Sequence, residues 1–549
     1  MHTDRFLRIP AIYRALEWAT GLHTAPASRR PLNLLTWFVA GIAALALLPS
    51  GYLVLRALGT DADELADLLD GRTLTVIGNS VALVSAVTVT AALIGVPFAW
   101  LITRTNLPFR RLWLIGGALP LVIPSYIGAL TYIAAFGPRG LLQQALAPLG
   151  VVALPSIYGF FGAWGTLTLF TYPYVLLNVR SALLNMDPAL EETAHSLGVG
   201  PGAVFRRLTL PQLRPALAGG MLFAALYTLG DFGAVSLMRY NAFTRAIFLQ
   251  YTGSFDRHRA AVLSLVLAGL TLSLLILEQR ANLRRNYRAG GAGAPRPIRP
   301  IALRGWKFPA LLFCGSVVAL GLLTPVGVLI AWMFQGIRAG MPFLADSLFR
   351  PLLNGIGISA ATAVAVSLLA VPLAILTVRS PSALHRWLVN LTYLNSGLPG
   401  LVVALALVFF AANLLPELYQ SFPILVYGYA VRFLPLGISA VRSTLGQITP
   451  RYEEAARSLG LRPWQVTMRI TAPLVRTGAL GGMALVFLSV MKELPITILL
   501  APTGFETLAT KIWTAQNEAA FTQIGAPALL LIVASALSLP LILEMHLSR

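Results

Sequence analysis

The sequence predicts an all-α polytopic membrane protein with about twelve transmembrane helices, arranged as two parallel repeats of six. Three observations support this fold class. Of the 549 residues, 57% are hydrophobic and only 11% are charged, whereas a soluble domain carries about a quarter charged residues. Apolar stretches of about 20 residues, the length that crosses a bilayer, recur along the chain. Finally, one polar segment occurs twice, far apart in the sequence.

The predicted spans divide evenly between the two halves of the chain. In the first half they are 34–58, 74–103, 113–136, 157–181, 216–238 and 260–278. In the second half they are 308–335, 355–378, 386–412, 420–441, 477–500 and 524–545. The stretch 157–181 has the weakest apolar signal, because Gly, Thr and Pro interrupt it.

The net charge of +20 suits a membrane protein better than a nucleic-acid-binding protein, because the basic residues gather in loops between spans. Positively charged loops stay on the cytoplasmic side. Residues 280–307 contain eight basic residues and no acidic one, whereas residues 59–71 contain five acidic residues and no basic one. We therefore expect 280–307 inside, 59–71 outside and both termini in the cytoplasm. The loop 239–259 departs from this pattern, since it should be external yet contains four arginines.

The duplicated segment reads EETAHSLGVGPGAVFRRLTLP at 191–211 and EEAARSLGLRPWQVTMRITAP at 453–473, with 11 of 21 positions identical. Other pairs extend the match, including GVPFAWLITR and AVPLAILTVR at 95–104 and 370–379. Because each half has an even number of spans, the two repeats have the same orientation. The predicted organisation is a cytoplasmic N-terminal segment at 1–33, a first repeat at 34–279, a cytoplasmic linker at 280–305 and a second repeat at 306–549.

Each copy predicts a short helix, a glycine turn and a second short helix, in the cytoplasmic loop between the fourth and fifth spans. The acids suit the positive end of the first helix dipole, Gly198 and Gly460 suit a left-handed C-cap, and Pro211 and Pro473 should end the second helix. The site residues are Glu191, Glu192, Ala194, Gly198 and Pro211 in the first copy, and Glu453, Glu454, Ala455, Ala456, Gly460 and Pro473 in the second. The residues alone leave two interpretations open: a docking surface for another protein, or an amphipathic loop repeated only by gene duplication.

Both copies resemble the EAA loop of the inner-membrane permeases of bacterial binding-protein-dependent ABC importers. The second copy has EAARSLG at 454–460, and the first has ETAHSLG at 192–198, with Thr in place of the middle Ala. The resemblance implies a type I importer permease of the bacterial inner membrane. Each loop would insert into a cleft of an ATP-binding subunit and pass its motion to the spans.

The resemblance also implies partners. These would be two copies of an ABC ATPase subunit, a periplasmic substrate-binding protein and the lipid bilayer, with no nucleic acid. The chain has no G-x-x-x-x-G-K-[S/T] phosphate loop, so we expect it to bind no cofactor, with ATP and Mg on the ATPase subunit. No Ser-His-Asp, Cys-His or zinc-type spacing appears in the sequence either, so we expect a permease subunit rather than an enzyme.

The candidate pathway or gate residues are Asp231, Glu493, Pro124 and Pro399, which occupy matched positions in the two repeats. Ionisable residues inside spans are costly and are candidates for function, and prolines can bend helices that line a pathway. Alternatively, the two carboxylates lie at the external ends of their spans, Lys492 merely pairs with Glu493, and the prolines are tolerated kinks.

The segments GDFGAVS at 230–236 and MKELPIT at 491–497 resemble the fused, double-length ferric-iron permeases. That group takes Fe(III) from a periplasmic ferric-binding protein, and the fused thiamine permeases share its architecture. No ligand set for a metal is identified in the sequence, so a metal site stays unknown. The alternatives are a thiamine or other small-solute ABC importer, an ion-coupled secondary transporter, and a membrane enzyme or scaffold.

Overall fold

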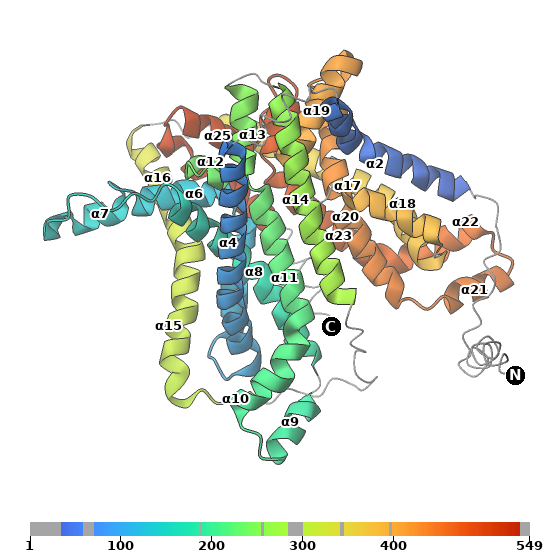
Figure 1. The fold of residues 1–549 in the computed structure, drawn as a ribbon, viewed down its shortest axis with the longest axis horizontal. Coiled ribbons are helices and arrows are strands. Elements are labelled where there is room, and N and C mark those ends of the chain that lie inside the picture. The colour runs from blue at the N-terminus through green and yellow to red at the C-terminus, as the bar shows by residue number, and fades with distance from the viewer. Residues whose placement is uncertain are drawn as a thin grey trace, which may run out of the picture.

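The computed structural model describes residues 34–58, 71–186, 188–253, 257–283, 300–340, 345–380, 382–394 and 398–537. Nearly all of this chain is helical (Figure 1). An isolated parallel bridge between Thr105 and Ile301 fastens the end of the linker to the end of the second helix. The N-terminal segment, most of the linker and the acidic residues before Gly71 lie outside the described residues, so the expected positions of the termini stay predictions.

The helices of the first repeat follow the predicted spans, with short helices between them. They are α2 (Leu34–Leu58), α4 (Gly71–Arg104), α5 (Arg110–Ala118), η1 (Leu119–Val122), α6 (Ser125–Phe136), α7 (Leu141–Leu146), η2 (Ala147–Leu149), α8 (Phe160–Asn185), α9 (Pro188–Ser196), α10 (Pro201–Val204), η3 (Phe205–Thr209), α11 (Leu210–Gly230), α12 (Gly233–Leu237), α13 (Phe243–Thr252) and α14 (Arg257–Leu283).

The second repeat has the same plan. Its helices are η4 (Arg304–Trp306), α15 (Lys307–Val318), η5 (Ala319–Leu323), α16 (Thr324–Arg338), α17 (Ala345–Arg379), α18 (Ala383–Leu394), α19 (Gly400–Leu414), η7 (Pro416–Leu418), α20 (Phe422–Gln447), α21 (Arg451–Ser458), α22 (Pro463–Val466), η8 (Thr467–Thr471), α23 (Ala472–Met491), α24 (Pro495–Leu500), α25 (Leu508–Asn517), η9 (Phe521–Gln523) and α26 (Gly525–Ala536).

The all-α polytopic fold is confirmed. Within the described residues, eight helices are long and apolar enough to cross a membrane, and one more pair would do so together across a bend. Three shorter apolar helices occupy the remaining predicted spans: Arg259–Leu274, Gly400–Leu414 and Phe521–Ala536.

Four predicted spans are not the straight helices that their apolar composition suggests. The stretch 113–136 is bent by 102° at the Pro124 break, and 386–412 divides into α18 and α19, which begins after Pro399. Both prolines have an extended backbone, with ψ of 142° and 144°. Proline also removes an N–H donor and disfavours the helical conformation of the residue before it, so a helix restarts after each one.

The stretches 216–238 and 477–500 also end early, at Gly230 and Met491, immediately before the carboxylate and the Lys-Glu pair respectively. A separate short helix, α12 or α24, then follows in each stretch. The candidate pathway residues Pro124, Asp231, Pro399 and Glu493 therefore all lie at breaks between helices.

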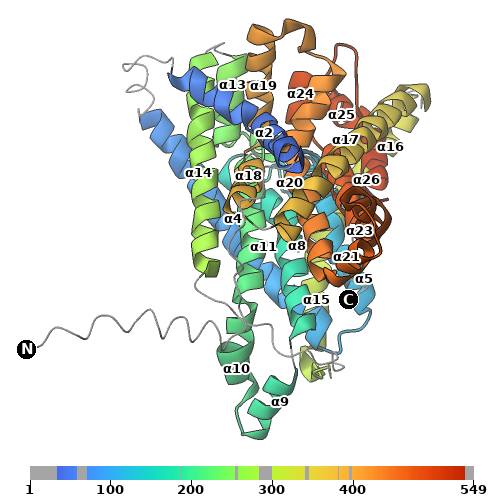
Figure 2. The same cartoon turned by 90° about the vertical axis from the view of Figure 1, so that its right-hand side faces the viewer.

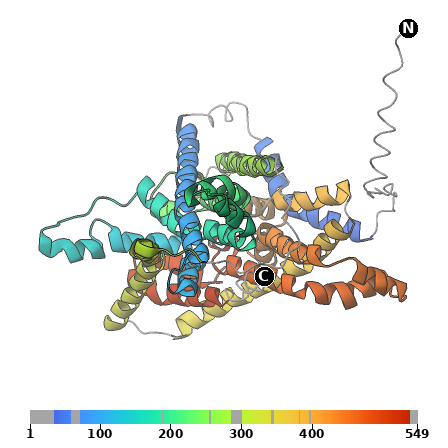
Figure 3. The same cartoon turned by 90° about the horizontal axis from the view of Figure 1, so that it is seen from below.

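The first helical span of each repeat packs on the other repeat. Helix α2 contacts α17, α18 and α19, while α16 contacts α6 and α15 contacts α5. The Tyr52 hydroxyl donates to the carbonyl of Phe409 at 3.1 Å, and the Tyr132 hydroxyl donates to the carbonyl of Leu320 at 2.8 Å. From below, dark blue α2 lies among the amber helices of the second repeat (Figure 3). This exchange joins the two repeats into one body.

Candidate functional site

The two duplicated loops form the predicted helix–turn–helix. Helix α9 projects from one end of the bundle (Figure 2), and α21 is its counterpart in the second repeat. Gly198 and Gly460 have φ of +79° and +84°, a region that side chains with a Cβ rarely adopt. After each turn, a backbone N–H bonds back to the helix, from Val199 to Ala194 at 3.0 Å and from Leu461 to Ala456 at 3.2 Å. This is the bonding of a Schellman cap.

The first acid of each loop faces its own chain. Arg379 Nε donates to Glu453 Oε1 at 2.9 Å, and the Thr471 hydroxyl donates to the same oxygen at 3.1 Å. Arg379 also donates from Nη2 to the carbonyl of Ile448 at 3.0 Å. The arginine is the last residue of α17, so this ion pair ties helix α21 to the end of a spanning helix. We call this Arg–Glu–Thr set the second clamp.

The first repeat has the equivalent set, which we call the first clamp. Arg104, the last residue of α4, lies with Nη1 3.4 Å from Glu191 Oε2. The Thr209 hydroxyl donates to Glu191 Oε1 at 2.8 Å. Side-chain exposure is 4% for the arginine and 16% for the glutamate, so the pair is largely desolvated. Sequence reasoning missed both arginines and both threonines, although matched arginines at 104 and 379 end the aligned segments at 95–104 and 370–379.

The second acid of each loop faces outward. Glu192 and Glu454 are exposed, as is Ala455. Beside them, Leu197 and Leu459 are 77% and 84% exposed. Each loop therefore exposes a carboxylate and a leucine on its outer side.

Two details of the predicted loops were wrong. Ala194 and Ala456 are 9% and 4% exposed, so they pack against their own chain, and of the three predicted site alanines only Ala455 is exposed. Pro211 and Pro473 do not end the second helix, which continues into α11 and α23. A π-helical turn, η3 or η8, precedes each proline, and its wider backbone removes the requirement for the N–H that proline lacks.

The broken helices bring Asp231 and Glu493 into a buried region beside the contact between the repeats, where they are 7% and 8% exposed. Asp231 accepts hydrogen bonds from the Ser125 hydroxyl, one residue after Pro124. The same carboxylate accepts the backbone N–H groups of Ala234 at 2.8 Å and Val235 at 3.3 Å, at the start of α12.

Glu493 has a different partner. Arg432 Nη1 donates to Glu493 Oε1 at 2.9 Å, and the pair lies against Gly400, where any side chain would overlap both groups. Lys492 does not pair with Glu493, as one interpretation of the sequence supposed. Its Nζ donates to the carbonyl of Leu121 in the first repeat at 2.9 Å.

These residues form what we call the central cluster: Ser125, Asp231, Arg432, Lys492 and Glu493. Sequence reasoning missed Arg432, which lies 61 positions before its partner. The repeats also touch here, since Gly230 packs near Pro399. Among the described residues, no three His, Cys, Asp or Glu side chains come together as a metal-binding group.

Comparison with known proteins identifies the family. Residues 91–288 and 367–543 both match the binding-protein-dependent transport system inner membrane component. The chain belongs to this family. The two matched segments contain both duplicated loops, both clamps and the whole central cluster, which places these features in the part shared with other members.

Individual members resemble this permease over its whole length or over part of it. A Fe(3+)-transport system permease protein of Haemophilus influenzae is 30% identical over 511 residues, covering 93% of this chain and 97% of that protein. A probable ABC transporter permease protein of Sinorhizobium fredii is 26% identical, covering 85% and 87%. A sulfate transport system permease protein of Escherichia coli is 30% identical over 216 residues, covering 38% of this chain and 73% of its own length.

Proposed function

We propose that this chain is the transmembrane permease subunit of an ATP-driven importer that carries Fe(III) from a periplasmic binding protein to the cytoplasm. The observation that carries the proposal is the pair of clamped coupling helices. Each presents an exposed Glu and Leu on a helix that an ion pair ties to a spanning helix. Such a helix can transmit a partner's movement to the membrane domain, and there is one per repeat.

In this proposal two copies of a separate ATPase subunit bind the two loops and hold ATP and Mg, while this chain binds no cofactor. Both termini lie in the cytoplasm, with the segments 1–33 and 280–305 on that side of the membrane. The repeats at 34–279 and 306–549 move relative to each other around the central cluster, with Pro124 and Pro399 as the bends and Asp231 and Glu493 as gate residues. The iron cargo is supported by the long match to the Haemophilus influenzae Fe(3+) permease.

The test is uptake of labelled Fe(III) and labelled thiamine by cells that carry the permease with its neighbouring ATPase and binding protein. The variant is Glu192→Lys/Glu454→Lys, which reverses two exposed charges and should leave the fold intact. Losing two interfacial charge contacts should reduce uptake by about 100-fold and prevent co-purification of the ATPase. Glu417→Lys is the matched control, because Glu417 is an exposed acid in η7, outside both coupling loops.

Each outcome decides a different part of the proposal. Iron uptake that the double variant removes and the control keeps supports both cargo and coupling. Thiamine uptake with the same mutant pattern keeps the coupling and overturns iron as cargo. Uptake that survives the double variant overturns the coupling role and favours an ion-coupled secondary transporter.

A further inference from the structure

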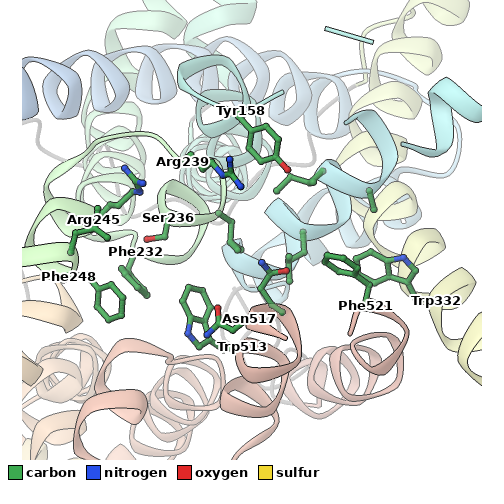
Figure 4. Close-up of a pocket in the computed structure, with 16 residues that line it drawn as sticks. Tyr158, Phe232, Ser236, Arg239, Arg245, Phe248, Trp332, Trp513, Asn517 and Phe521 are labelled. Carbon is green, nitrogen blue, oxygen red and sulfur yellow. The ribbon is translucent and has the colours of Figure 1, made fainter. Parts of the chain in front are cut away.

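A cavity of about 700 Å³ lies between the two repeats (Figure 4). The helices α12, α13 and α25, which help to line it, lie at the end of the molecule opposite α9 (Figure 1). Its walls come from α6, α12 and α13 of the first repeat and from α16, α25 and η9 of the second. Aromatic rings from both repeats meet across it, with Phe232 and Trp513 centroids 5.4 Å apart. A concave site of this size, lined by aromatic side chains with a few polar groups, is typical of small-ligand binding.

The charged groups that line this cavity are both arginines, Arg239 and Arg245, and its lining contains no Asp or Glu. Both come from the loop whose positive charge departs from the expected topology. Arg239 has φ of +54° and holds its guanidinium 5.0 Å from the ring centroid of Tyr158. Arg245 is half-buried and has no carboxylate within 4.0 Å in the part of the chain that the structure describes.

Neutral polar atoms complete the lining. The Ser236 hydroxyl and the Gln516 side-chain oxygen are buried without a hydrogen-bond partner among the described residues, and both residues line the cavity together with Asn517. Buried polar atoms are normally paired with protein or bound water. The serine hydroxyl can donate to a ligand in the cavity, in addition to the two guanidinium groups, whereas the Gln516 oxygen only accepts and would pair with an O–H of a protonated oxyanion.

The central cluster adjoins this cavity in the chain, since Phe232 lies in the cavity wall and directly follows Asp231. The cavity and the cluster together contain four basic groups, the two cavity arginines with Arg432 and Lys492, and two acidic groups. This excess of positive charge would repel a bare trivalent cation and attract an anion.

We infer that this cavity binds a phosphate-like oxyanion, and that Fe(III) enters the permease as a complex that carries such an anion. The second part rests on the proposed iron cargo. Fe(III) takes hard, anionic oxygen ligands, and an oxyanion bound to iron still has free oxygens. Arginine presents planar N–H donors that match those oxygens in bidentate geometry. Arg239 and Arg245 would contact the free oxygens while the aromatic walls exclude water.

The binding experiment uses the complete permease–ATPase complex in lipid nanodiscs, without the binding protein, and [³²P]phosphate as the probe. Saturable binding is expected for the native chain and for Arg338→Gln, an exposed arginine of α16 that does not line the cavity. Arg239→Gln/Arg245→Gln should weaken binding by at least about tenfold, since each charge-assisted hydrogen bond contributes substantially. Arg239→Lys/Arg245→Lys should recover part of it. Absence of saturable binding, or equal binding by the glutamine variant, overturns the inference.

The transport experiment uses proteoliposomes and the binding protein loaded with ⁵⁵Fe and [³²P]phosphate. Entry of both labels together, reduced about tenfold by the glutamine variant, supports the inference. Entry of ⁵⁵Fe without ³²P overturns it. A variant that weakens only the affinity for the binding protein also overturns it, because the arginines would then contact acidic residues of that protein. If native permease takes up no ⁵⁵Fe but still binds phosphate, the proposed iron cargo fails while the oxyanion site stands.

Discussion

The two clamps and the two sides of the central cluster arose from one duplication, yet they have diverged to different degrees. Both clamps keep the same three residue types, an Arg at the end of a spanning helix, a Glu on the coupling helix and a Thr on a π-helical turn. The central cluster does not. Both carboxylates accept a backbone N–H three residues further on, but Asp231 also accepts a second backbone N–H and a hydroxyl, whereas Glu493 also pairs with a guanidinium.

The aligned helices α8 and α20 show where the difference arises. Both have 26 residues, offset by 262 positions, so Phe170 occupies the place of Arg432. The same offset sets Gly230 opposite Lys492. In the proposed function, two copies of one ATPase subunit would bind the two duplicated loops, and this would account for the matching clamps. One cargo would pass between the repeats, so the two sides of the central cluster would be free to differ.

The largest expected difference between the repeats follows from removing one carboxylate at a time. Glu493→Ala leaves Arg432 as an unpaired, mostly buried cation, which should reduce the free energy of unfolding by about 3 kcal/mol. Asp231→Asn keeps an acceptor for neutral donors and should cost about 1 kcal/mol. Chemical denaturation of the purified permease in detergent measures both. Equal losses would mean that the cluster is electrostatically symmetric after all.

The clamps provide the second comparison. Arg379→Met removes bonds to Glu453 and to the Ile448 carbonyl, and should loosen α21 by about 2 kcal/mol. Arg104→Met removes one longer contact, of 3.4 Å, from Glu191, which keeps the hydrogen bond from Thr209, and should loosen α9 by about 1 kcal/mol. Hydrogen exchange of the α9 and α21 amides measures the loss of protection in each helix separately. The argument fails if the two helices lose equal protection, or if α9 loses more.

The sequence predicts the coupling helices well because their signals are local. The glycine turns and the two acids lie within a few residues of each other, and the duplication doubles the signal. The direction in which each acidic side chain points depends on residues that are distant in the sequence. Glu453 faces inward because of Arg379, which is 74 positions away in the sequence, and no pattern within an eight-residue helix identifies that partner.

The positions of the helix breaks also could not be predicted from composition. The stretches around Pro124 and Pro399 are as apolar as a continuous span, and proline within spanning helices is tolerated elsewhere in this chain, at Pro97 and Pro372. The difference depends on the packing around each proline. The role of Arg432 could not be predicted for the same reason. The partner of a lone arginine in an apolar stretch becomes clear only when α20 packs beside the end of α23.

A smaller loss of stability is expected when Lys492, which bonds across the contact between the two repeats, is replaced. Lys492→Met removes the hydrogen bond to Leu121 and leaves its carbonyl without that donor, which should cost about 1.5 kcal/mol. The matched variant Gly230→Ala should be nearly neutral, because its added Cβ would lie 3.7 Å from Pro399, an ordinary contact. Thermal unfolding of the two proteins side by side provides the comparison. A larger loss for the alanine variant would show that close backbone approach, rather than the lysine, joins the repeats here.

The smallest expected effect tests the symmetry of the coupling loops most directly. Gly198→Ala and Gly460→Ala each place a Cβ in the left-handed region, which should cost about 1 kcal/mol. Neither new Cβ would meet an atom within 4 Å, so the cost is backbone strain alone and should be equal in the two loops. Asn variants should recover part of the loss, since Asn tolerates this conformation. Hydrogen exchange of the cap amides of Val199 and Leu461 measures both loops in one protein. Unequal losses of protection would show that the two loops differ, as the two sides of the central cluster do, and the loops could then no longer be treated as equivalent.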